Sequence, residues 1–174
     1  MSNTTFPLLE AVTNKNHDAV KLLLGLGADP NQLTRRKHKP LIYAVNSEDA
    51  YIIALLIEHG ADVNFKFSSV YSTPLMDAAT IGNLEIVKLL VERGADLDDS
   101  SRYSARAIHY AGYYGHLDIF QYLFEKHLDR EDPRWFKRLF SKWFDGSKGQ
   151  MRPHILEYVT KHPRYKEIEE RASY

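Results

Sequence analysis

Two kinds of side chain in this sequence could carry out acid–base or metal chemistry. His109 and His116 lie seven residues apart, and imidazoles bind transition metals or transfer protons. Asp29, Asp62 and Asp96 carry carboxylates, which act as general acids and bases when two of them share a site. These aspartates recur about every 33 residues, which disfavours a shared site. The sequence has no phosphate-binding glycine loop, Gly-x-Ser-x-Gly turn or His-Glu-x-x-His metal helix.

A basic run extends from Arg35 to Lys39 and could contact phosphates or an acidic patch on a protein. The alternative is a solvated loop. The chain has 23 Lys plus Arg and 23 Asp plus Glu, so its formal net charge is +0. A single patch on a neutral protein releases few counterions from nucleic acid. We therefore expect Arg35, Arg36 and His38 to face an acidic protein, and we do not expect nucleic acid as a partner.

The composition is that of one soluble domain or a short repeat array, with 174 residues of which 44% are hydrophobic. The absence of cysteine excludes disulfides, thiolate zinc sites and cysteine nucleophiles. The first 20 or so residues lack the pattern of a secretory signal. The longest apolar run, Ala50 to Ile57, is far shorter than the roughly 20 residues that span a membrane. We expect a cytoplasmic protein that binds no cofactor, metal or membrane.

Two sets of short motifs recur with the same period of about 33 residues. One is Gly-Ala-Asp, which begins at Gly27, Gly60 and Gly94. The other opens each unit, as Pro7-Leu8, Pro40-Leu41, Thr73-Pro74-Leu75 and Ala107-Ile108-His109. Proline is favoured at the first position of a helix, and glycine closes a helix in the left-handed conformation. Between the motifs, apolar residues fall at helical spacing, as Leu84, Val87 and Leu90 do. The sequence predicts stacked helix pairs.

These motifs resemble the ankyrin repeat, which reads Thr-Pro-Leu-His, paired alanines, a Gly-His turn, an Ile-Val-Leu-Leu helix and Gly-Ala-Asp-Val-Asn. The third unit matches best, from Thr73-Pro74-Leu75 through Ala78-Ala79 to Gly94-Ala95-Asp96-Leu97. The resemblance covers roughly residues 4–127 and implies an all-α ankyrin-repeat solenoid of helix-turn-helix units with short extended fingers. The expected units are approximately residues 1–33, 34–66, 67–99 and 100–127.

The resemblance also gives the candidate chemical residues structural roles. His109 holds the Thr-Pro-Leu-His position and His116 the Gly-His turn, where histidine hydrogen-bonds the backbone between repeats. Asp29, Asp62 and Asp96 belong to the closing turns. Units one and two lack the Gly-His turn, having Asn16-His17 and Glu48-Asp49 near that place, so we expect distorted inner turns there. Unit four has His127 instead of a closing glycine and is expected to end the regular array.

Residues 128–174 lose the period and are expected to form a divergent helical cap, because a stacked repeat leaves its last apolar face bare. Asp132-Pro133 predicts the start of an amphipathic helix at 134–144 whose aromatic residues share one face: Trp135, Phe136, Phe140, Trp143 and Phe144. Its other face is basic, so an alternative is a helix that lies on a membrane or in a partner's groove. A second helix is expected from Pro153 to Lys161, with Ile155, Leu156 and Val159 on its apolar side.

Ankyrin proteins generally bind partners through the concave face formed by their inner helices and fingertips. Alignment on the opening motif of each unit predicts these partner-binding residues: Arg35, Arg36, His38, Tyr43, Asn46, Asp77, Thr80, Ile81, Arg102, Tyr103, Tyr110, Tyr113 and Tyr114. Tyrosine and arginine often supply most of the binding energy of an interface. The tyrosines of unit four could instead be core, but we expect at least two of them to be partly exposed.

The resemblance and the missing catalytic motifs together predict a protein-binding module and not an enzyme. A short array without a catalytic domain fits an enzyme inhibitor or a bacterial toxin-neutralising immunity protein. The alternatives are an adaptor or host-directed effector, and a membrane-associated regulator that uses helix 134–144. We expect the partner to be another protein and the chain to be monomeric on its own.

Overall fold

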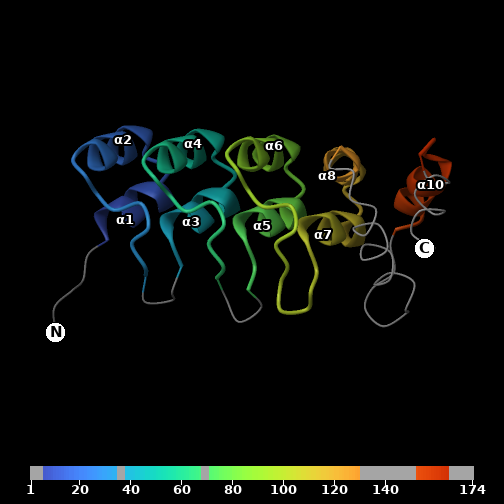
Figure 1. The fold of residues 1–174 in the computed structure, drawn as a ribbon. Coiled ribbons are helices and arrows are strands. Elements are labelled where there is room, and N and C mark those ends of the chain that lie inside the picture. The colour runs from blue at the N-terminus through green and yellow to red at the C-terminus, as the bar shows by residue number, and fades with distance from the viewer. Residues whose placement is uncertain (1–5, 35–37, 68–70, 130–151, 165–174) are drawn as a thin grey trace.

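The structure, a computed structural model, describes residues 6–34, 38–67, 71–129 and 152–164. These ranges contain nine helices: α1 (Pro7–Thr13), α2 (His17–Gly25), α3 (Pro40–Asn46), α4 (Ala50–Glu58), α5 (Pro74–Ile81), α6 (Leu84–Glu92), α7 (Ala107–Tyr114), α8 (Leu117–Leu128) and α10 (Pro153–Lys161). Their only β pairing is one isolated bridge, Phe67 to Ser72. The inner helices α1, α3, α5 and α7 form one row and the outer helices α2, α4, α6 and α8 a second (Figure 1). The predicted all-α repeat fold is confirmed.

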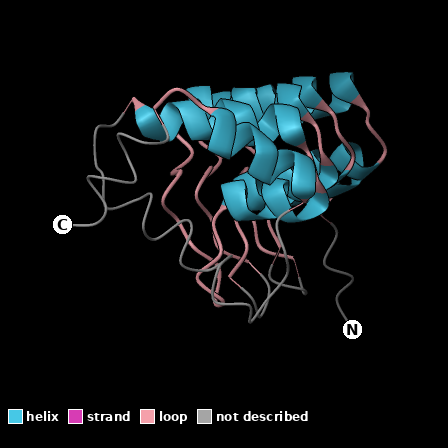
Figure 2. Cartoon of the chain, turned by 90° about the vertical axis from the view of Figure 1, so that its right-hand side faces the viewer, coloured by secondary structure: helices cyan, strands magenta, loops and turns pink. Residues whose placement is uncertain are grey.

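Local signals in the sequence set where the helices begin. Proline occupies the start of α1, α3 and α5, where the missing N–H removes no hydrogen bond. The first three outer helices begin differently, because a polar side chain before each one accepts a backbone N–H: Asn16 before α2, Asp49 before α4 and Asn83 before α6. α8 has no such side-chain cap. Each of units one to three is thus a proline-started helix followed by a side-chain-capped one. The extended fingers project from one side of the helical body (Figure 2).

In every unit, the turn between the inner and outer helix has a residue with positive φ at the same position. Gly82 and Gly115 have φ of 95° and 86°, and the matching residues of units one and two are Lys15 at 52° and Glu48 at 57°. The first two turns are distorted only slightly: α1 and α3 are one residue shorter than α5 and α7, and the N–H of Lys15 and of Glu48 bonds three residues back instead of four. A left-handed non-glycine residue costs roughly 1–2 kcal/mol. Both side chains make contacts to the next unit that offset this cost: Lys15 Nζ donates to the carbonyl of Ser47 at 2.6 Å, and Glu48 accepts from the amide of Asn83 at 2.9 Å.

The core is continuous along the stack, because each unit contributes buried side chains at equivalent positions. The residue after the opening proline, or after Ala107 in unit four, is nearly inaccessible throughout: Leu8, Leu41, Leu75 and Ile108. The small pair Ala78 and Ala79 is fully buried, which lets neighbouring inner helices approach closely. Each unit therefore completes the core of the unit beside it, as expected for a solenoid.

Asparagine side chains join the closing turns of successive units. Asn31 donates to the carbonyl of Gly60 at 2.7 Å and accepts the N–H of Asp62 at 2.9 Å. Asn64 bonds in the same way to Gly94 at 3.1 Å and Asp96 at 2.9 Å. The next position in this series is Asp98, whose carboxylate cannot donate, and unit four has no closing glycine to receive such a bond. The ladder of asparagines therefore ends where the regular array ends.

The C-terminal end of the stack is covered by α10. Ile155 and Val159 are fully buried, and Tyr158 packs its ring against Phe120 and Phe124 of α8. The hydroxyl of Tyr158 donates to Glu125 at 2.9 Å, and burial, followed by this hydrogen bond and the charge of Glu125, raises the pKa of Tyr158 to about 12. Helix Pro153–Lys161 is confirmed, but Leu156 is 38% exposed, so its predicted place on the apolar side is wrong. The predicted helix at 134–144 lies outside the described residues.

Residues at the start of α10 also hydrogen-bond to the unit before them. In unit four, His116 contacts the carbonyl of Thr80 in unit three at 3.1 Å. One step further along, His154 contacts the carbonyl of Gly115 at 3.1 Å, and the Nε of Arg152 donates to the carbonyl of Tyr113 at 3.2 Å. Tyr113 is the unit-four residue equivalent to Thr80, so Arg152 bonds to the carbonyl that matches the one bound by His116, and His154 bonds two residues further on.

Candidate partner-binding surface

The predicted binding residues come from two structural sources that lie on one side of the stack. Eight residues of the inner helices α3, α5 and α7 supply one group, and the loops between units supply the other (Figures 1 and 2). The rigid rows of helices hold the first group in register, since each inner helix packs on the next. Arg35 and Arg36 lie outside the described residues, so their role stays a prediction.

Unit four presents the largest aromatic area among the predicted residues. Tyr103 is 54% exposed, and Tyr113 and Tyr114 are each 48% exposed, while Arg102 beside them is also exposed. The rings of Tyr113 and Tyr114 meet edge to face with their centres 5.1 Å apart. Their side chains are thus partly ordered before any partner binds, which lowers the entropy lost on binding. The expected exposure of at least two of these tyrosines is confirmed.

Other predicted residues are less available, because they already pack on the core. Tyr110, Tyr43 and Ile81 are half-buried against it. Thr80 donates its hydroxyl to the carbonyl of Met76 at 2.9 Å. Asn46 is exposed at the end of α3. These positions form a shallower, more polar continuation of the tyrosine area of unit four.

A carboxylate lies between units two and three at the base of the fingers. Asp77 of α5 is half-buried and accepts the hydroxyl of Ser72 at 2.8 Å. Burial raises the pKa of Asp77, although the Ser72 hydrogen bond and the charge of His38 oppose the shift. The ring of His38 contacts the rings of Tyr43 at 5.9 Å and Phe67 at 5.5 Å. Two fingers and two inner helices therefore meet at this point, which sequence alignment did not reveal.

One exposed residue on the fingers was missed by the sequence analysis. Tyr71 lies in the finger of unit three, is 54% exposed and has a left-handed φ of 54°. It lies outside the inner-helix positions used for alignment, but the frequent role of tyrosine as an interface anchor was a usable signal. Tyr71 and Tyr103 occupy successive fingers, so both add aromatic area to the same side of the stack.

The residues that first suggested catalysis have structural roles. His116 joins units three and four, and Nδ1 of His109 accepts the backbone N–H of Arg106 at 3.1 Å. Asp29, Asp62 and Asp96 each accept the N–H of the residue two positions later, at 2.8, 3.0 and 2.9 Å. Within the described ranges, no group of three or more His, Asp or Glu side chains could hold a metal ion.

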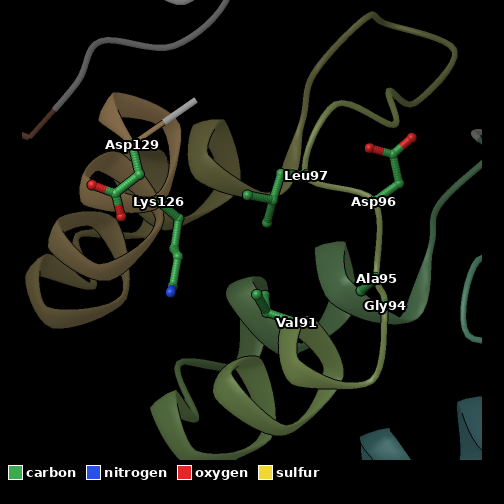
Figure 3. A pocket seen from close by; sticks show the side chains of 7 residues that line it. All are labelled: Val91, Gly94, Ala95, Asp96, Leu97, Lys126 and Asp129. Carbon is green, nitrogen blue, oxygen red and sulfur yellow. The ribbon is translucent and has the colours of Figure 1, made fainter. Parts of the chain in front are cut away.

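An open cleft of about 510 Å³ lies between the closing turn of unit three and the C-terminal end of α8. Lys126 extends into the space between α8 and α6, whereas Asp96 and Asp129 point away from each other (Figure 3). The walls of the cleft are Val91, Leu97 and backbone of the closing turn. These groups do not form a nucleophile–base or metal arrangement. In the part of the chain that the structure describes, no helix is long and apolar enough to cross a membrane.

The model of the family described as ankyrin repeats (3 copies) matches residues 8–101 and 66–133. The chain therefore belongs to the ankyrin repeat family, in which repeats of this kind serve to bind other proteins.

Three relatives have names that bear on function. Cyclin-dependent kinase 4 inhibitor B of Bos taurus is 33% identical over 116 residues, which cover 67% of this chain and 88% of that protein. The Mus musculus protein of the same name is 34% identical over 116 residues, with the same coverage. An ankyrin repeat protein of Fowlpox virus (strain NVSL) is 32% identical over 110 residues, or 63% of this chain. The matched region is 25% of the fowlpox protein, so this chain corresponds to about a quarter of it.

Proposed function

We propose that this chain binds a protein partner through its concave face, with Tyr103, Tyr113 and Tyr114 as the main anchors. The observation that carries the proposal is the exposure of three aromatic rings on one unit, two of them already in contact. Large aromatic side chains lose little conformational entropy for the area they bury, so they are favoured as anchors. The less exposed positions on α3 and α5 extend the contact area toward Asp77.

The consequence of binding that fits best is stoichiometric inhibition of an enzyme. Two relatives that are covered over 88% of their length are named as inhibitors of cyclin-dependent kinase 4. A chain that contributes a surface and no reacting group can inhibit by covering a partner's active site or by holding it in an inactive state. No described residue favours a bacterial toxin over a kinase as the target. We place this activity in the cytoplasm, which fits a sequence without cysteine.

The test begins with purified cyclin-dependent kinase 4 and affinity capture with mass spectrometry, to establish a partner. Isothermal titration then compares the native chain with Tyr113→Ala and Tyr114→Ala. Each substitution should weaken binding by at least about 2 kcal/mol, as the loss of a central aromatic anchor does.

The matched control uses the outer layer, where Lys88→Ala and Glu92→Ala lie on α6 away from the fingers. These variants should bind as the native chain does. Unchanged affinity for both tyrosine variants, together with loss of binding for Lys88→Ala or Glu92→Ala, would place the partner on the outer helices and refute the proposed surface. Circular dichroism of each variant separates lost binding from unfolding of unit four.

A further inference from the structure

The last turn of α7 carries two of the proposed tyrosine anchors, and its sequence favours a loose turn. It reads Gly112-Tyr113-Tyr114-Gly115, whereas the same turn of unit three reads Ala79-Thr80-Ile81-Gly82. Glycine destabilises a helix relative to alanine, because it loses more backbone entropy on folding. Both tyrosines are 48% exposed, while their counterparts in unit three are half-buried. Side-chain packing therefore fixes this turn less than it fixes the equivalent turn of unit three.

Residues at the start of α10 bind the backbone of this turn. The last four carbonyls of an α-helix have no partner within the helix. The N–H of Arg152 donates to the carbonyl of Gly112 at 3.4 Å, and its Nε donates to the carbonyl of Tyr113 at 3.2 Å. Nε2 of His154 lies 3.1 Å from the carbonyl of Gly115, which can only accept a hydrogen bond. Three carbonyls of the turn are thus bound by a segment about 39 residues later in the chain.

The absence of a side chain at Gly115 lets these two residues lie against the turn. A Cβ built on Gly115 would lie 3.2 Å from Cγ of Arg152 and 3.4 Å from the ring of His154, so an added methyl group would crowd both side chains. The guanidinium of Arg152 also brings a positive charge to the C-terminal end of α7, where the helix dipole favours a cation. Shape, hydrogen bonds and charge therefore all favour the same conformation of the turn.

We propose that Arg152 and His154 are positioning residues for partner binding, which hold the turn of Tyr113 and Tyr114 in the conformation that the partner recognises. The inference rests on the proposed function of these tyrosines as anchors. An anchor that is ordered before binding loses less entropy when the partner binds. The edge-to-face contact of the two rings, with centres 5.1 Å apart, depends on the backbone of both residues being held. The start of α10 thereby acts on the binding surface through the backbone of α7.

Docking of α10 and binding of the partner are then coupled, and the size of the coupling has an upper limit. The apparent affinity equals the intrinsic affinity multiplied by the fraction of molecules whose turn is ordered. Loss of one hydrogen bond shifts the equilibrium between the ordered and the frayed turn by about two- to tenfold. The affinity for the partner therefore falls by no more than about tenfold. Loss of a tyrosine anchor itself weakens binding at least about thirtyfold, so the two effects differ in magnitude.

Two substitutions of equal length isolate the hydrogen bond of Arg152. Arg152→Gln places an amide N–H where Nε of the arginine lies, whereas Arg152→Met has the same length and no donor. Hydrogen exchange of the free chain measures the order of the turn. The amides of Gly115 and His116 should exchange about two- to tenfold faster in the Arg152→Met variant than in the Arg152→Gln variant. His154→Ala should speed exchange of the same amides. Lys161→Ala is the control and should leave them unchanged, since Lys161 pairs with Glu157 of its own helix at 2.6 Å.

Titration of both Arg152 variants with purified cyclin-dependent kinase 4 measures the effect on binding, at a temperature where circular dichroism shows each variant to be folded. The Arg152→Met variant should bind about two- to tenfold more weakly than the Arg152→Gln variant. Equal exchange rates in the two variants overturn the proposal, and so do equal affinities. A loss of thirtyfold or more overturns it as well, because Arg152 would then contact the partner directly. A native chain that does not bind the kinase refutes that target alone, and the exchange rates of the free chain then decide the positioning role.

Discussion

The pKa values of Asp49 and Asp77 are shifted in opposite directions, so these two carboxylates affect stability in opposite ways. Asp49 caps α4, and although burial alone would raise its pKa, the hydrogen bond from His17 at 2.8 Å and the N–H of Ile52 lower it overall. Asp77 has only the Ser72 hydroxyl among described side chains as a hydrogen-bond donor, and burial raises its pKa. The first carboxylate stabilises the fold when ionised, and the second is held in the fold at a cost when ionised.

The pH dependence of two variants should therefore differ in sign. The raised pKa of Asp77 means that its ionisation opposes folding at pH values above its unfolded pKa of about 3.9. Asp77→Asn should raise the melting temperature at pH 7, and the gain should vanish as the pH falls below about 4. Asp49→Ala should cost about 1 kcal/mol at pH 7, and that loss should shrink as acid protonates the native carboxylate. Thermal unfolding followed by circular dichroism from pH 2 to 7 measures both, and shifts of the same sign at pH 7 would contradict the assignment.

Two glycines with the same backbone conformation should tolerate alanine differently. Gly82 and Gly94 have φ of 95° and 89°, so alanine strains the backbone at both by roughly 1–2 kcal/mol. At Gly82 the new Cβ would also lie 2.4 Å from the ring of His116, whereas at Gly94 it meets nothing within 4 Å. Urea unfolding should show a larger loss of stability for Gly82→Ala than for Gly94→Ala. Equal losses would mean that His116 moves freely, and that its bond to Thr80 contributes little.

At the scale of the helix, α6 is an amphipathic element that packs one face on the core and exposes the other to solvent. Its inward residues Ile86, Val87 and Leu90 are nearly inaccessible, while Glu85 and Lys88 are exposed. Leu89 lies at the border and is only partly buried, packed against the edge of the core. The helical spacing of Leu84, Val87 and Leu90 identified the face that packs on the core, but it omitted the buried Ile86.

Adjacent leucines of α6 therefore form a matched pair for a stability measurement. Leu90→Ala removes a fully buried side chain and should cost about 2–5 kcal/mol. Leu89→Ala should cost less than half as much, because water already reaches its side chain and little cavity is created. Denaturant unfolding gives both values. Equal losses would show that the border of the outer layer is packed as tightly as the core.

At the scale of the whole molecule, the described stack ends in a helix that takes the place of a further repeat. His154 and Arg152 bond to unit four, and Ile155 with Val159 fills its apolar face. Since each unit of a solenoid is stabilised mainly by its neighbours, loss of this helix should weaken unit four first. Unit four also carries the proposed aromatic anchors, so the proposal predicts that loss of stability at this end also weakens partner binding.

A neighbouring pair on α10 tests this covering role. Ile155→Ala should destabilise the chain by about 2–5 kcal/mol, whereas Leu156→Ala should change stability by about 0.5 kcal/mol or less. Calorimetric unfolding measures the loss, and hydrogen exchange should show faster exchange in α7 and α8 than in α3 for the Ile155 variant. A native-like melting curve for Ile155→Ala would show that α10 is an independent segment.

How much of this protein the sequence determines depends on the range of the interactions. The period of about 33 residues, the helix-starting prolines and the closing glycines act within a few residues of each other, so sequence alone predicted the helix pairs and their order. The resemblance to the ankyrin repeat placed His116 and the three closing-turn aspartates in structural roles. Helix Pro153–Lys161 was predicted for the same reason.

Only the tertiary structure decided which surfaces are free, because burial depends on what a distant part of the chain covers. Leu156 and Ile155 are neighbours in an apolar stretch, yet packing on α8 buries one and leaves the other to solvent. Leu22 and Leu55 hold the same place in the repeat, but Leu22 is 63% exposed and Leu55 is 8% exposed among the residues that the structure describes. Lys15 and Glu48 adopt a left-handed conformation at the inner turn where units three and four have glycine, and the side chains of both bond to the next unit. The sequence determines the elements, and contacts between units determine which residues remain available to bind.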